Sequence, residues 1–135
     1  MPDHPTNIET SRVATSAADP VSSPGLIELR DALRRFSAER DWDQFHTPKN
    51  LASALCVEAA ELLEHFQWLT DAESANLDTA QRAQVREEIA DVLLYLVRLA
   101  DRLDVDLIAA ARDKLALNAR KYPVDKARGN RRKYT

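Results

Sequence analysis

Apolar residues recur at steps of three and four positions along most of the chain, which is the spacing of one face of an α-helix. This spacing predicts four helices, at about residues 25–40, 48–69, 79–103 and 105–121. Thr47 and Pro48 suit the start of the second helix, and Asp78 with Gln81 has the spacing of a capping box before the third. No strand-like alternation and no internal repeat is visible. The pattern therefore predicts an all-α fold that resembles a four-helix bundle and associates through its helix faces.

The chain of 135 residues is the length of one domain, preceded by a segment of different composition. Four of the six prolines fall in residues 1–24, among Ser, Thr and Asn, so this segment is expected to be a disordered leader. The helical domain is expected over residues 25–123, where Pro123 ends the last helix. Residues 124–135 form a basic C-terminal tail.

The composition excludes several classes of protein. Two glycines in the whole chain make a Gly-rich phosphate loop or a turn-rich β fold improbable. The single cysteine, Cys56, lies beside an apolar stripe and is interpreted as a small buried hydrophobe in a reducing compartment. The longest strongly apolar run, residues 92–97, is too short to cross a membrane, and residues 1–24 lack the apolar stretch of a signal peptide. A cytoplasmic protein without membrane contact is expected.

Glu58 occupies a position where the helical pattern calls for an apolar residue. On a helical projection it falls about 20° from the line of leucines that should face the core. Glu61 lies on the near flank of the same stripe, and Glu64 points roughly to the opposite side. In the third predicted helix, Glu88 and Asp91 repeat this spacing beside an apolar stripe. If the two helices pack through these stripes, four carboxylates meet at one edge of the core.

Several carboxylates can share such a site only if they are protonated or neutralised, because a buried unpaired charge costs several kcal/mol. An all-oxygen donor set favours Mg²⁺, with Mn²⁺ as the other choice, over Zn²⁺. A di-iron bundle needs Glu-x-x-His on two helices, and the third predicted helix contains no histidine. Chance spacing of glutamates on solvated helix faces is the alternative explanation.

The charge distribution supports a phosphate-handling site. Residues 120–135 carry a net charge of +6 and the remainder of the chain −9. A Mg²⁺ ion held by carboxylates most often engages phosphates, and one side of the fourth predicted helix offers polar partners for them. In the loop before the second helix, an aromatic ring and a histidine can stack on and hydrogen-bond a base; two further aromatics are equally compatible with packing. The candidates are Lys114, Asn118, Lys121 and Tyr122 for phosphate, and Trp42, His46, Trp68 and Tyr95 for the nucleoside.

These motifs resemble a known family. The pair of "E-x-x-E" at residues 58–61 and "E-x-x-D" at residues 88–91 is similar to the signature of the MazG-like all-α nucleoside triphosphate pyrophosphohydrolases. Within this family, the sequence is most similar to the dCTP pyrophosphatase branch. The segments that carry this likeness are "ERDWDQFHTPKNL", "FQWLTD", "EEIADVLLYLVRLAD", "NARKYPVDKARG" and "RKYT".

The resemblance implies Mg²⁺-dependent hydrolysis of dCTP, or of a 5-modified dCTP, to the monophosphate and pyrophosphate, in sanitation of the nucleotide pool. It assigns the metal to Glu58, Glu61, Glu88 and Asp91, and the nucleoside and phosphate contacts to the two groups of candidates above. It also implies a homotetramer built as a dimer of dimers, with sites near subunit boundaries. Glu61 is the preferred general base because it lies further from the core than Glu58.

Two alternatives remain open at this stage. Leu33 stands where some animal relatives have a histidine of the nucleotide pocket, so another nucleotide such as dUTP is a possible substrate. A non-catalytic helical module could instead bind nucleic acid through the basic tail. That second alternative leaves the inward carboxylates unexplained, and an acidic body repels nucleic acid, so a nucleic-acid partner is not expected.

Overall fold

The computed structural model describes residues 24–133, and the predicted leader lies outside this range except for Pro24. The described chain is helical throughout, without a strand, which confirms the predicted all-α fold. Two short helices occupy segments expected to be a polar loop and the tail. The helices are α1 (Pro24–Glu39), α2 (Pro48–Glu64), α3 (Asp71–Ser74), α4 (Thr79–Arg102), α5 (Leu107–Lys121) and α6 (Val124–Ala127).

The predicted helix starts are confirmed by their capping hydrogen bonds. Thr47 Oγ1 accepts from the backbone N–H of Asn50 at 3.2 Å, with Pro48 opening α2. At α4, Asp78 Oδ1 accepts from the Gln81 N–H at 2.8 Å, and Gln81 Oε1 accepts from the Asp78 N–H at 3.0 Å. These reciprocal bonds satisfy N–H groups that the first helical turn leaves unpaired.

Aspartates take the backbone conformation that glycine usually supplies where α1 and α4 end. Asp41 and Asp104 have φ angles of 53° and 54°, in the left-handed region that Asp tolerates better than most residues. After Asp104 the chain turns back, and the Val105 N–H donates to the Ala100 carbonyl at 2.9 Å. Both turns fix the direction in which the next segment leaves.

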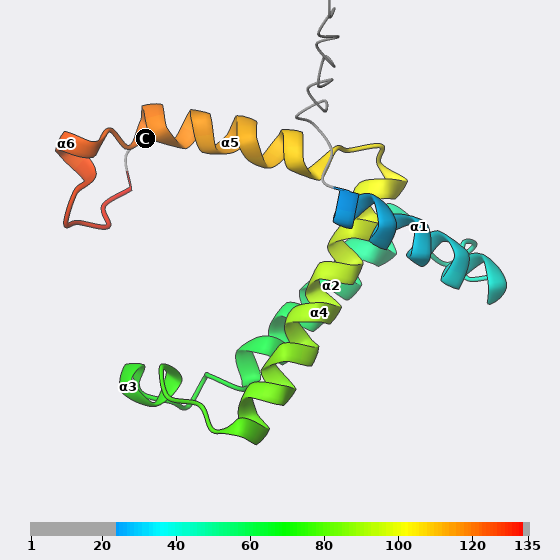
Figure 1. Cartoon of the computed structure of the whole chain (residues 1–135), viewed down its shortest axis with the longest axis horizontal. Coiled ribbons are helices and arrows are strands. Elements are labelled where there is room, and N and C mark those ends of the chain that lie inside the picture. The colour runs from blue at the N-terminus through cyan, green and yellow to red at the C-terminus, as the bar shows by residue number, and fades with distance from the viewer. Residues whose placement is uncertain (1–23, 134–135) are drawn as a thin grey trace, which may run out of the picture.

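Helices α2 and α4 pack side by side along most of their length and form the centre of the molecule (Figure 1). Helix α1 lies against the C-terminal part of α4, whereas α5 extends away from the α2/α4 pair (Figure 1). The four long helices are therefore present close to the predicted bounds, but they do not close into a bundle within one chain.

The buried core of a single chain is small. Among the described residues its apolar members are Leu51 in α2 with Val85, Val97 and Ala100 in α4. The α4 stripe expected to face the core also contains Ile89, Leu96 and Leu103, which are 54%, 38% and 53% exposed. Cys56 is exposed as well, so its interpretation as a buried residue is wrong for the single chain. Helices α2 and α4 pack mainly on each other, with α1 against α4, and α5 extends away from this pair (Figure 1).

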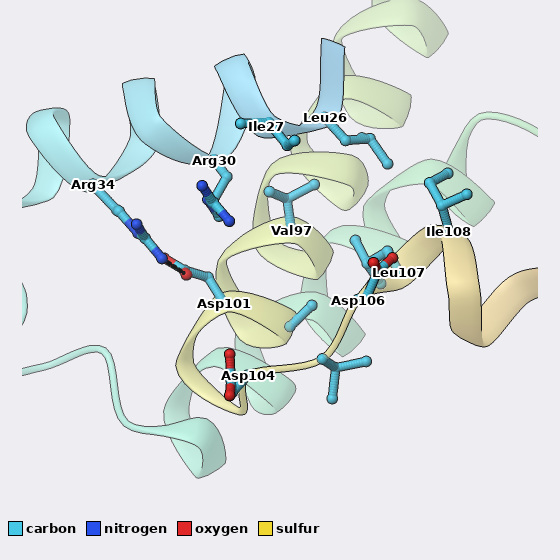
Figure 2. Close-up of a pocket in the computed structure, with 12 residues that line it drawn as sticks. Leu26, Ile27, Arg30, Arg34, Val97, Asp101, Asp104, Asp106, Leu107 and Ile108 are labelled. Atoms are coloured by element: carbon cyan, nitrogen blue, oxygen red, sulfur yellow. Dashed lines mark hydrogen bonds and ion pairs between the residues drawn. The ribbon is translucent and has the colours of Figure 1, made fainter. Parts of the chain in front are cut away.

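A chain of ion pairs joins α1 to α4. Arg34 Nε donates to Asp101 Oδ2 at 2.8 Å, and Asp101 in turn accepts from Arg98 at 3.3 Å (Figure 2 shows the Arg34–Asp101 pair). The hydrogen bonds from Arg34 are the main cause that holds the pKa of Asp101 below its ordinary value. Arg34 and Asp101 also border a cavity of about 200 Å³ between α1, α4 and the start of α5, which the acidic residues discussed below do not line (Figure 2).

The lowered pKa of Asp101 predicts how stability depends on pH. A carboxylate with a depressed folded-state pKa adds free energy of unfolding above its ordinary pKa of about 3.9, and this gain is lost as the pH falls through the lowered value. Asp101→Asn should therefore reduce stability at neutral pH, with a difference from wild type that shrinks below about pH 4. Urea unfolding at several pH values measures this. Asp113→Asn, exposed on α5, is the control; a difference that stays constant with pH would contradict the account.

Candidate metal centre

Three carboxylates from two helices meet on the α2/α4 pair. Glu58 of α2 and Glu88 and Asp91 of α4 each place one oxygen so that all three oxygens lie within 4.8 Å of one another. All three side chains are half-buried. The expected convergence of the two E-x-x-E/D patterns is therefore present for three of the four predicted ligands, and Glu58 does face inward, as its position among the leucines predicted.

Glu61, the fourth predicted ligand, lies beside this group rather than within it. It is exposed and is not among the three carboxylates that come together. It remains close enough to act on Glu58: burial, followed by a hydrogen bond with Glu61 and the negative charges of Glu61, Asp91 and Glu88, raises the pKa of Glu58 above its ordinary value. The four acids thus form one electrostatic unit with Glu61 at its edge.

One basic side chain touches this unit within residues 24–133. His65 Nε2 lies 3.7 Å from Glu88 Oε1. His65 is not among the residues predicted for the site, although its spacing of seven residues from Glu58 places it on the same face of the helix. One imidazole cannot balance several carboxylates, so the cluster retains a negative charge.

The donor set fits a divalent cation. Carboxylate oxygens are the ligands that hard cations prefer, and three of them from two packed helices leave further positions for water or a substrate oxygen. A cation would also offset the burial and the repulsion that raise the pKa of Glu58. The residues that could hold it are Glu58, Glu88 and Asp91, with Glu61 beside them.

Helix α4 connects the acidic cluster to the predicted nucleoside contacts. From the cluster toward the C-terminus, the same face presents Glu88, Asp91, Tyr95 and Arg98 at steps of three and four residues. Asp91 and Arg98 are thus separated by two turns, roughly 10 Å along the helix axis. This face of α4 therefore presents the carboxylates of the cluster and, two turns further toward the C-terminus, Arg98, which donates a hydrogen bond to His46.

His46 and Trp42 lie together where the loop before α2 meets α4. His46 Nδ1 accepts from Arg98 Nε at 3.2 Å, and the rings of Trp42 and His46 stand edge to face with centroids 6.2 Å apart. Trp42 also packs edge to face on Phe36 of α1, at 5.7 Å, and keeps 43% of its surface exposed. An exposed ring beside a histidine can provide both stacking and a hydrogen bond to a base.

The remaining predicted contacts are not assembled within one chain. Trp68, in the connection after α2, is 87% exposed. The phosphate candidates Lys114, Asn118 and Lys121 lie on α5, with Tyr122 as its C-cap, and α5 points away from the α2/α4 pair (Figure 1). A single chain therefore presents the acidic cluster, Trp42 and His46 at the α2/α4 pair, and the basic phosphate candidates on α5, which extends away from that pair.

The fold is all-α, and two packed helices bring together an acidic cluster that could hold a cation. A profile of the MazG-like family matches residues 54–135, which include the cluster, α4 and α5. The chain belongs to the MazG-like family.

Named relatives extend the match over most of the chain. It is 48% identical over 114 residues to dCTP pyrophosphatase 1 of Homo sapiens, covering 83% of this chain and 67% of the relative. With dCTP pyrophosphatase 1 of Rattus norvegicus it shares 46% identity over 126 residues, or 90% and 74% of the two chains. The crystal structure of a pyrophosphatase from Archaeoglobus fulgidus superposes with a TM-score of 0.71 at 44% identity, over 76% of this chain and 95% of that one.

The raised pKa of Glu58 leads to a prediction about stability and metal binding. Because the folded state disfavours its ionised form, Glu58→Gln should raise the Tm of the metal-free protein at neutral pH. In wild type, Mn²⁺ should raise stability by about 2.7 kcal/mol at 100 times its Kd, and this gain should be lost in Glu58→Gln. Calorimetry with and without Mn²⁺ measures both effects. Glu64→Gln, exposed on the same helix, is the matched control; an undiminished Mn²⁺ response in Glu58→Gln would exclude this site.

Proposed function

We propose that this protein is a Mg²⁺-dependent nucleoside triphosphate pyrophosphohydrolase. It converts dCTP, or a 5-modified dCTP, and water to the monophosphate and pyrophosphate, and so removes this triphosphate from the nucleotide pool of the cytoplasm. The observation that carries the proposal is the group of inward carboxylates of Glu58, Glu88 and Asp91. Relatives named dCTP pyrophosphatase 1, 45–48% identical, support the choice of nucleotide.

Glu58, Glu61, Glu88 and Asp91 are the proposed metal ligands. When bound there, a divalent ion supplies neutralising charge for the triphosphate and lowers the pKa of a nearby water. Glu88 and Asp91 project from one rigid helix, so an ion held by them would have a fixed position relative to α4. Glu58, which is half-buried and repelled by its neighbours, is the ligand that gains most from neutralisation.

Glu61 is the proposed general base. It is the most exposed of the four acids and stands at the edge of the cluster, where one of its oxygens stays available to take a proton. Glu61 accepts the proton of the water that attacks the α-phosphorus in line with the bond to the β-phosphate. Lys114 and Lys121, with Asn118 and Tyr122, stabilise the charge that develops on the departing pyrophosphate.

The α5 helix that binds the phosphates is proposed to come from a neighbouring subunit. In one chain α5 points away from the α2/α4 pair that carries the acidic cluster (Figure 1), so we expect its cations to act on the cluster of another copy. Apolar side chains left open along α2, α4 and α5 support association, since a monomer rarely exposes so many. Examples are Val57, Leu63, Ile89, Leu93 and Leu115. The proposed assembly is a homotetramer, a dimer of dimers.

The nucleoside half of the substrate is assigned to the other end of the α4 face. Trp42 stacks on the base, His46 donates a hydrogen bond, and Trp68 and Tyr95 complete the enclosure when subunits associate. The chemistry at the carboxylates does not depend on the base, so the same site on another nucleotide, such as dUTP, is the second candidate. Within residues 24–133, no helix has the length and apolar character needed to cross a bilayer.

Pyrophosphate release from a panel of dNTPs and NTPs with Mg²⁺ tests the proposed reaction. Release should be fastest with dCTP or a 5-substituted dCTP, and Glu61→Gln should lower kcat by about 10²- to 10⁴-fold through loss of the base. Glu64→Gln on the same helix should behave as wild type. Release from a different nucleotide would replace the substrate and keep the chemistry. A folded, oligomeric protein that releases pyrophosphate from none of them would overturn the proposal.

Subunit mixing tests whether α5 acts on a neighbour's cluster. Glu88→Gln should inactivate the acidic site and Lys121→Ala should weaken the phosphate site, so each variant alone is impaired. Mixed oligomers contain some sites that pair an intact cluster with an intact α5 from the other subunit, and activity should reappear when the two are unfolded and refolded together. Glu88→Gln refolded with Glu58→Gln is the control, since neither chain carries an intact cluster. Activity in the Glu88→Gln/Lys121→Ala mixture no higher than the average of the two variants refolded separately would place α5 and the cluster of one site in the same chain.

A further inference from the structure

Arg98 is a fully enclosed cation beside the nucleoside end of the site. It is 5% exposed, and each of its three nitrogens donates to a different residue. Nε donates to His46 Nδ1 at 3.2 Å, one terminal nitrogen donates to Asp101 Oδ2 at 3.3 Å, and the other pairs with Asp43. The ion pair of Asp101 with Arg34 braces the guanidinium from the side of α1 (Figure 2). The direction of Arg98 Nε is therefore fixed.

The chemistry of guanidinium determines the protonation state of the imidazole. An arginine N–H donates and never accepts, so His46 Nδ1 must carry a lone pair in this contact. A neutral imidazole with an accepting Nδ1 has its proton on Nε2. Ser37 Oγ also lies 3.4 Å from Nδ1, but a hydroxyl can donate or accept and imposes no choice. Arg98 is thus the group that selects the tautomer.

We propose that Arg98 is a positioning residue that holds His46 as the neutral tautomer with the proton on Nε2, so that the ring offers a hydrogen-bond donor to an oxygen acceptor of the nucleotide. This inference rests on the proposed function, in which His46 contacts the nucleoside. In the part of the chain that the structure describes, His46 Nε2 makes no hydrogen bond, so its N–H is available to a ligand. A pyrimidine carbonyl is an acceptor of the required kind.

The charges around His46 agree with a neutral ring. The pKa of His46 lies below its ordinary value. Burial is the largest cause, the positive charge of Arg98 is the second, and Arg102 adds a smaller effect in the same direction. Asp43 opposes them, but its carboxylate is paired with Arg98 rather than with the imidazole. A proton on Nδ1 would set an N–H against the Arg98 N–H, which explains why the cationic form is disfavoured here.

Nitrogen-15 NMR of the imidazole tests the tautomer without any substrate. In wild type the His46 shifts should report a neutral ring protonated on Nε2 at pH values where an ordinary histidine, with a pKa of about 6.5, is charged. In Arg98→Met the pKa should rise toward that ordinary value and Nδ1-protonated ring should appear. Arg102→Met, which removes a cation that does not contact the ring, should keep the wild-type tautomer. A wild-type ring protonated on Nδ1, or an Arg98→Met ring identical to wild type, would overturn the proposal.

Kinetics with the cleaved nucleotide separate positioning from a purely structural role. Arg98→Met should raise KM by roughly ten-fold with little change in kcat, since a ground-state hydrogen bond is lost. Below about pH 6.5 the variant's imidazole becomes charged and regains its Nε2 proton. The ratio of variant to wild-type KM should therefore fall toward one as the pH is lowered, whereas a ratio independent of pH would show a structural effect alone and contradict the proposal.

A second variant covers the case in which Arg98→Met does not fold because it leaves Asp101 without one partner. In Arg98→Met/Asp101→Asn the buried carboxylate is also removed, and the amide oxygen of the new side chain can still accept from Arg34. The same tautomer change is expected for this pair, with Asp101→Asn alone retaining the Nε2 proton. Because the NMR readout needs no turnover, a protein that hydrolyses no nucleotide but shows these shifts would disprove the proposed function and leave the role of Arg98 toward His46 intact.

Discussion

Repulsion between half-buried carboxylates is the constraint on which the rest of this structure depends. Glu58 lies on the core-facing side of α2 and meets Glu88 and Asp91 from α4, with Glu61 close by. Four acids and one histidine leave excess negative charge at the contact between the two central helices. Burial first, and then the neighbouring acids, raise the pKa of Glu58. A fold that kept leucine at this position would be more stable. This cost is explained if the cluster binds a cation, because the bound ion would neutralise the carboxylates and stabilise the folded protein.

A second buried ionic group behaves in the opposite way. Arg98 is more deeply enclosed than any of the clustered acids, yet every nitrogen of its guanidinium has a partner within the chain. Helix α4 carries part of the acidic cluster and Arg98 on one face, two turns apart. One rigid helix therefore has excess negative charge at the cluster and a fully paired cation at Arg98. This polarity matches a ligand with anionic phosphates at one end and a neutral base at the other.

The sequence was sufficient where local chemistry decides the outcome. Periodicity and capping residues predicted the four long helices, and the angular position of Glu58 among leucines predicted its contact with Glu88 and Asp91. The failures concern tertiary placement. Cys56 lies beside an apolar stripe and Ile89 lies on one, but a stripe does not show whether the surface that covers it belongs to the same chain. The partners of Arg98 come from residues up to 55 positions away, and no local pattern marks such a contact. Helix α3 is not predicted, although Thr70 and Glu73 form a capping box, because a helix of four residues shows too little apolar periodicity.

A crystal structure with Mg²⁺ and a dCTP analogue that carries an imido bridge between the α- and β-phosphates tests the central claim most directly. The account predicts a Mg²⁺ ion about 2.0–2.1 Å from carboxylate oxygens of Glu58, Glu88 or Asp91 that also contacts phosphate oxygens, with the base near Trp42 and His46. It further predicts that α5 of a neighbouring subunit approaches those phosphates. A nucleotide bound elsewhere, or a triphosphate whose metal ion has no ligand from these carboxylates, would contradict it.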